Sequence, residues 1–210
     1  MWESRTAPLS GVLFAVLLIA SFLVDSNTDY MPPADEIVAH LTDGPMRVMS
    51  AAYLRLLAAA ALIWFSGSLH KTIRGFDDDS GRLSLLAFGG GVLAAALIAM
   101  GAAAVVAAAE RVWMVEMIDS GAAAALYDMA GIAIGNGAPL GLGVMIGAAG
   151  IARIRTKAGS PWIGWSSVGI GFGLLSPYAW VVLALALIWI SIAGLWMYRE
   201  QSDPVPVKVS

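Results

Sequence analysis

The stretch that decides the fold is Leu83–Ala109, LSLLAFGGGVLAAALIAMGAAAVVAAA, which contains no charged residue. A helix needs about 20 apolar residues to cross the roughly 30 Å hydrocarbon core of a bilayer. This stretch is long enough to do so, and its small side chains favour close contact between helices. It therefore predicts a transmembrane helix.

Five further apolar stretches accompany it, at about 9–24, 48–69, 122–152, 161–175 and 178–197. The 210-residue chain is 59% hydrophobic and only 13% charged, whereas about a quarter of the residues of a soluble domain are charged. The sequence thus predicts one all-α domain over 1–210, a polytopic bundle of six transmembrane helices.

Basic residues alternate from loop to loop, and cytoplasmic loops are enriched in Lys and Arg. With six spans, one side of the membrane holds only Arg47 and Arg111. The other side holds Arg5, Lys71, Arg74, Arg82, Arg153, Arg155, Lys157, Arg199 and Lys208. This bias predicts that both termini are cytoplasmic. Cleavage near Ser26, as in a signal peptide, would leave five spans, but the cleavage site is poor and favours an intact first span.

The longest outer segment, 25–47, contains the pattern of a short helix. Pro32-Pro33-Ala34-Asp35-Glu36 is typical of a helix start, with proline and acids at its positive end. Ile37, Val38 and Leu41 form a small apolar face, and Gly44-Pro45 ends the pattern. We expect an amphipathic helix that caps the bundle on its outer face. A lid or partner-binding role is the alternative.

Two ionisable residues lie within the predicted spans, where charge is costly and marks candidate functional sites. Arg55 and Asp128 are each about 10 Å from the outer end of their span. They are expected to form an ion pair, with hydroxyls from Tyr53 and Tyr127 nearby. Separate placement in the headgroups, or a substrate or proton site, are the alternatives.

A third candidate is Asn136, in Gly135-Asn136-Gly137-Ala138-Pro139 at the middle of the fourth span. Pro139 lacks a backbone donor and the glycines loosen the helix. A kink with Asn136 bonded to a neighbouring helix is one interpretation, and a broken-helix binding site is the other. Small residues recur every fourth position in the third span, at Ala87, Gly91, Ala95, Ala99, Ala103 and Ala107. The pattern returns in the fourth span at Gly131, Gly135, Gly143 and Gly147, with Pro139 interrupting it. This spacing indicates a close pair of helices or an oligomer interface. The alternative is that it arises by chance from the high content of alanine and glycine.

Several function classes lack support. The chain has no cysteine, two histidines far apart and a net charge of −3, so no cofactor, no metal centre and no nucleic-acid partner is predicted. Motifs of metalloproteases, serine hydrolases and phosphate-binding loops are absent from the sequence.

The stretch Lys157-Ala158-Gly159-Ser160-Pro161-Trp162-Ile163-Gly164-Trp165 resembles a loop in uncharacterised bacterial multi-pass families. Asn136–Pro139 and the arginine at 55 are similar too. The resemblance implies six helices in a bacterial inner membrane, not an activity. We therefore expect a non-enzymatic packing or partner-binding component, in contact with lipid and with a second copy or another membrane protein. A small transporter or sensor is the alternative, and a lipid-modifying enzyme is third.

Overall fold

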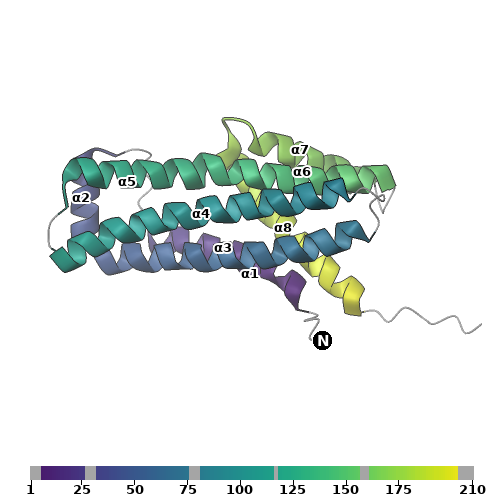
Figure 1. The fold of residues 1–210 in the computed structure, drawn as a ribbon, viewed down its shortest axis with the longest axis horizontal. Helices are drawn as coiled ribbons and strands as arrows, with labels where there is room; N and C mark the ends of the chain where they lie inside the picture. The colour runs from purple at the N-terminus through teal and green to yellow at the C-terminus, as the bar shows by residue number, and fades with distance from the viewer. Residues whose placement is uncertain (1–5, 27–31, 76–80, 116–117, 157–160, 203–210) are drawn as a thin grey trace, which may run out of the picture.

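The computed structural model describes residues 6–26, 32–75, 81–115, 118–156 and 161–202. Long helices lie side by side along the long axis of the molecule, and one short helix crosses an end (Figure 1). In chain order the helices are α1 (Ser10–Val24), α2 (Ala34–Asp43), α3 (Pro45–Arg74), α4 (Arg82–Val115), α5 (Ser120–Ile132), α6 (Ala138–Thr156), α7 (Pro161–Leu174) and α8 (Ala179–Ser202). No strand occurs within these ranges. A short 3-10 turn, Ala7–Leu9, precedes α1, and a π turn, Ala133–Gly137, joins α5 to α6.

Five helical segments of the described chain are long and apolar enough to cross a membrane: Ala7–Val24, Pro45–Arg74, Arg82–Val115, Ser120–Thr156 and Ala179–Arg199. The fold is thus the all-α fold expected of a multi-pass membrane protein.

The fifth predicted span, 161–175, corresponds to α7, which is not among these five segments. Its 14 residues extend about 21 Å, short of a hydrocarbon core of about 30 Å. Figure 1 shows α7 returning along α6 and turning into α8 part-way along the bundle, far from α2. The turn is closed by backbone hydrogen bonds from Ser176 to Gly173 and from Ala179 to Ser176.

The helices approach most closely where glycines face one another. A Cβ added at Gly90 of α4 would lie 2.7 Å from the carbonyl oxygen of Gly141, and one at Gly141 would lie 2.5 Å from the backbone nitrogen of Ala94. The third and fourth predicted spans therefore form the close pair that their small residues indicated. The contact uses Gly90 rather than Gly91, which faces Ser66 of α3.

The other small residues have different neighbours. A Cβ at Gly143 would lie 2.8 Å from the Gly171 carbonyl oxygen of α7. Gly131, Gly135 and Gly147 have no atom within 4 Å of an added Cβ. Only part of the predicted glycine series is thus used between helices of this chain.

Two apolar clusters fill the bundle. One lies at its centre, around Phe14, Phe65 and Met145, all of them fully buried. The second lies beneath α2, where Ile37 and Leu41 are fully buried against α4 and α5. Burial of such a side chain contributes about 1.5–3 kcal/mol, and this contribution holds α2 against the end of the bundle.

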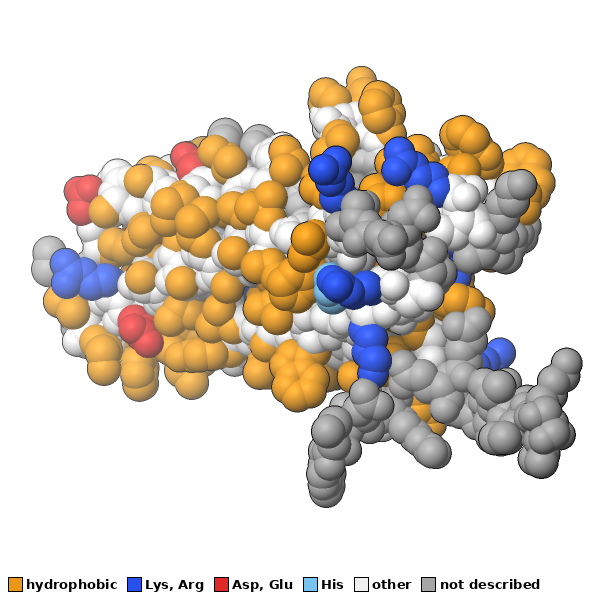
Figure 2. Space-filling model, turned by 45° about the vertical axis from the view of Figure 1, so that its right-hand side comes forward, with side chains coloured by type: hydrophobic (Ala, Val, Ile, Leu, Met, Phe, Trp, Pro, Cys, Tyr) orange, Lys and Arg blue, Asp and Glu red, His pale blue; other side chains and the backbone are white. Residues whose placement is uncertain are grey.

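Charge separates along the bundle. Figure 2 shows Asp and Glu toward one end and most Lys and Arg toward the other. We call these the α2 end and the basic end. Acidic residues at the α2 end include Asp25, Asp35, Glu36, Asp43, Glu110, Asp119 and Asp128. Basic residues at the basic end include Lys71, Arg74, Arg82, Arg153, Arg155 and Arg199.

Candidate functional site

A buried carboxylate at the α2 end joins three helices. Asp25, the residue after α1, is 7% exposed. Its Oδ1 lies 2.9 Å from Nε2 of His40 on α2 and 4.0 Å from Nε of Arg47 in the first turns of α3. Arg47 Nη2 also lies 3.3 Å from His40 Nδ1. These three residues, here called the Asp25 cluster, tie the end of α1 to α2 and α3.

Arg55 of α3 lies next to this cluster. Its guanidinium carbon is 5.4 Å from the ring centroid of Phe22, a separation typical of a cation–π contact. The carboxylate of Asp25 acts on it electrostatically. Its buried Nε has no hydrogen-bond partner within the described ranges. Arg55 is therefore held over an aromatic ring and near a carboxylate.

The ion pair expected between Arg55 and Asp128 is not formed. Between described residues, both ion pairs within 4.0 Å belong to Asp25. Asp128 is only partly buried. The carboxylate that acts electrostatically on Arg55 is instead Asp25, at the end of α1; Asp128 of α5 is not among the groups that act on it.

Tyr127 joins the same region from α5. Its ring lies edge-on to His40, with centroids 6.3 Å apart and ring planes at 86°. Its buried hydroxyl lacks a hydrogen-bond partner in the described part of the chain. The structure thus brings together two of the predicted site residues, Arg55 and Tyr127. The side chain of Tyr53 is half exposed, and neither it nor Asp128 makes a side-chain hydrogen bond or ion pair with a described residue.

Sequence reasoning missed Asp25, His40 and Arg47 as site residues. All three lie in or beside the segment 25–47, which the sequence presents as a solvated loop with a short helix. The signal available was a histidine on the helix that carries the buried Ile37 and Leu41. Which acid this histidine meets depends on where α2 packs relative to the end of α1, and periodicity does not give that position.

Asn136 lies in the π turn and points away from the bundle. Pro139 cannot donate to the carbonyl four residues before it, and the backbone widens by one residue over Ala133–Gly137 before continuing as α6. The helix is widened but not broken. Asn136 is exposed, and the exposed side chains on either side of it along this face are Met129, Ile132 and Leu140.

The side chain of Asn136 makes no hydrogen bond to any described residue. The neighbouring-helix partner that the sequence suggested is therefore absent from the described part of this chain. Asn136 and the Asp25 cluster are separate features, the first on the outward face of a long helix and the second buried beneath α2.

The chemistry of the buried region is electrostatic. Asp25 Oδ1 lies beside His40 and Arg47, and the Asp25 carboxylate also acts electrostatically on Arg55. Among the described residues no group of three or more His, Cys, Asp or Glu side chains is placed to hold a metal ion. The arrangement stabilises the position of α2.

Comparisons with family models, with curated proteins and with solved structures find no match to this chain.

Proposed function

We propose that this protein is a non-enzymatic, multi-pass membrane component that associates with a second copy of itself through the α5–α6 face bearing Asn136. The observation that carries the proposal is the exposed amide of Asn136, without a partner in the described chain, on an otherwise apolar face. The residues from Met129 to Ala152 contain no charge, so this part of the long helix is suited to the hydrocarbon.

An amide in hydrocarbon is costly unless it is hydrogen-bonded, by about 4–8 kcal/mol relative to water when nothing can bond to it. Asparagine carries both donors and an acceptor. Two copies related by a two-fold axis can therefore satisfy each other's Asn136 side chains through the same surface. Gly131 and Gly135, with open space at their Cα atoms, allow a second helix to approach closely.

The proposed membrane topology follows the charge separation. We place the basic end in the cytoplasm, because Lys and Arg concentrate there, and both termini on that side. The α7–α8 hairpin then begins and ends on the cytoplasmic side, with the short α7 reaching only part of the way across. A bacterial inner membrane, as the resemblance of Lys157–Trp165 implies, is the proposed location.

A transporter or sensor has less support from the geometry. It requires a hydrated path that reaches both Asn136 and the Arg55 region. Neither of the two cavities described for the bundle has Arg55 or Asn136 in its wall. Converging acids of the kind that a lipid-modifying enzyme needs are also not found among the described groups.

Cysteine cross-linking tests the interface directly, because the natural chain has no cysteine. Ile132→Cys places a thiol about one turn from Asn136 on the same exposed face, and Ile188→Cys places one on the exposed face of α8. Oxidation in native membranes is expected to give a disulfide dimer with Ile132→Cys and little with Ile188→Cys. Adding Asn136→Leu to Ile132→Cys is expected to lower the dimer yield several-fold. Equal cross-linking at both positions, or none at Ile132→Cys, would contradict the proposal.

A further inference from the structure

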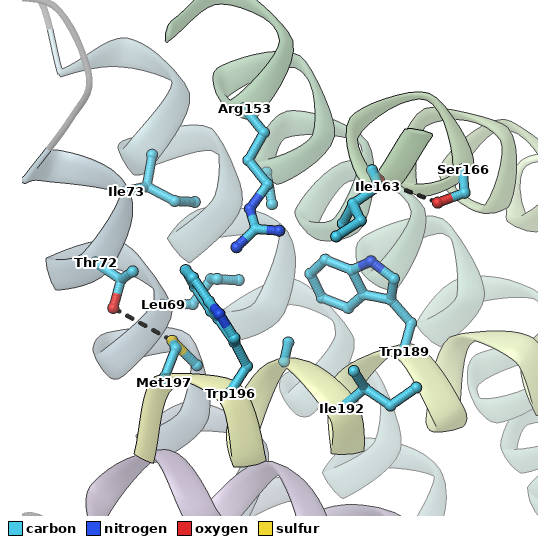
Figure 3. A pocket seen from close by; sticks show the side chains of 12 residues that line it. Leu69, Thr72, Ile73, Arg153, Ile163, Ser166, Trp189, Ile192, Trp196 and Met197 are labelled. Atoms are coloured by element: carbon cyan, nitrogen blue, oxygen red, sulfur yellow. Dashed lines mark hydrogen bonds between the residues drawn. The ribbon is translucent and has the colours of Figure 1, made fainter. Parts of the chain in front are cut away.

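A cavity of about 290 Å³ opens between four helices near the basic end of the bundle. Its walls come from the last turns of α3 and α6, the first turns of α7 and the second half of α8, as Figure 3 shows. The walls are mainly apolar, with large side chains from Leu69, Ile73, Ile163, Trp189, Ile192 and Trp196. Small residues at Ala149 and Ala193 leave the space between them.

The wall of this cavity is held in place by specific contacts. The indole Nε1 of Trp189 donates to Ser167 Oγ at 2.7 Å, which fixes α8 against α7. Thr72 Oγ1 lies 3.2 Å from Met197 Sδ, which connects α3 to α8 on the other side. Since the polar atom of Trp189 is used in this bond, its ring presents apolar surface to the cavity.

A single cationic side chain reaches into this apolar space. The guanidinium carbon of Arg153 lies 4.2 Å from the ring centroid of Trp196, and Figure 3 shows the guanidinium between the two indole rings. Stacking on a tryptophan face stabilises the cation and fixes its direction. The head of Arg153 therefore sits where an anionic group attached to an apolar chain would meet it.

We propose that this cavity binds one acyl chain of an anionic phospholipid, with the lipid phosphate at Arg153. Its volume lies just below the range of typical ligand pockets, about 300–1,000 Å³, and suits part of an acyl chain rather than a whole lipid. The cavity lies at the basic end of the bundle, where Lys71 of α3 is on the same helical turn as the wall residue Thr72. Basic pockets between transmembrane helices recognise anionic headgroups in this way.

Both parts of the ligand are needed for this recognition. Apolar walls supply the affinity for the chain, whereas Arg153 supplies preference for the headgroup. The site is on a different helix face from Asn136 and does not depend on the proposed self-association.

Native mass spectrometry of the full-length protein, released from nanodiscs with equal amounts of phosphatidylglycerol and phosphatidylcholine, tests the proposal. We expect one retained phosphatidylglycerol per chain, in several-fold excess over phosphatidylcholine. Arg153→Gln is expected to remove this preference. Arg155→Gln, which changes an exposed arginine outside the wall, is the charge-matched control and is expected to keep it.

Two further experiments separate the contribution of the acyl chain to binding from that of the headgroup. Ala193→Phe fills the cavity and is expected to abolish retention of the lipid although Arg153 is unchanged; Ser166→Leu serves the same purpose if the first variant does not fold. Glycerol phosphate, which lacks the chain, is expected not to displace the lipid. Equal retention by the natural protein and both filled variants would overturn the proposal, as would equal losses in Arg153→Gln and Arg155→Gln or displacement by glycerol phosphate alone.

Discussion

His40 on α2 places its Nε2 2.9 Å from the Oδ1 of Asp25, the first residue beyond α1. This contact links a surface helix to the end of a membrane-length helix through two side chains that are 10% and 7% exposed. It explains why a short helix of ten residues can keep a fixed position on the bundle, because isolated helices of this length are marginal in water.

The first prediction concerns this contact. Asp25→Ala removes the carboxylate that lies 2.9 Å from His40 Nε2 and 4.0 Å from Arg47 Nε, and we expect a loss of about 1–3 kcal/mol in the free energy of unfolding. Amide hydrogen exchange in α2 should rise more than exchange in α4. Asp35→Ala, at an exposed position of α2, is the control. Equal effects of both substitutions would show that the contact does not hold α2.

A second prediction concerns the hydroxyl of Tyr127, which is buried and has no hydrogen-bond partner in the described chain. Tyr127→Phe removes an unsatisfied polar group and keeps the ring against His40. We expect the thermal stability in detergent to stay the same or to rise. A clear loss of stability would indicate that the hydroxyl has a partner, such as a bound ligand, in the membrane.

The third prediction tests the contact between α4 and α6. Gly141→Ala places a Cβ 2.5 Å from the backbone nitrogen of Ala94, where neither backbone can yield cheaply, and overpacking of this kind costs about 1–3 kcal/mol. Gly147→Ala on the same helix meets nothing within 4 Å and is expected to stabilise the helix by about 0.5–1 kcal/mol. Thermal unfolding of the two variants should therefore shift in opposite directions.

A fourth prediction addresses the short α7. If the α7–α8 hairpin reaches only part of the way across, Tyr178→Cys at its turn should react poorly with a membrane-impermeant maleimide added outside intact cells. Ser120→Cys, at the exposed start of α5, should react readily. Comparable labelling at both positions would show that α7 crosses the bilayer completely.

Much of the fold follows from the length and polarity of the apolar stretches. The uncharged run from Leu83 to Ala109 becomes the centre of α4, and a helix over 34–43 occupies the segment where Pro33 and Asp35 predicted a helix start. Apolarity alone predicts α7 as a full span, although its 14 residues, as hydrophobic as those of a span, are too few to cross a hydrocarbon core of about 30 Å. Its neighbour α8 has the length that α7 lacks.

The candidate site was harder to predict, because it depends on which helix faces which. Depth along a helix can be counted from the sequence, and this count led to the pairing of Arg55 with Asp128. Rotation about the helix axis decides the actual neighbours, and here the guanidinium of Arg55 lies over the Phe22 ring and is influenced by the charge of Asp25. Similarly, the sequence gives no sign of whether Asn136 faces a neighbouring helix or the outside.

The π turn at Ala133–Gly137 has a consequence for the phase of the long helix on either side of it. A π turn contains one residue more than an α turn, and each residue of a helix advances its direction by about 100°. Deleting Ile134 is therefore expected to restore a regular helix and to turn the whole of α5 by about that angle relative to α6. Tyr127 would then leave His40 while Gly141 stayed against Ala94. The single additional residue thus sets the rotation of α5 about the helix axis separately from that of α6. One continuous helix can therefore place Tyr127 against His40 of α2 and Gly141 against Ala94 of α4.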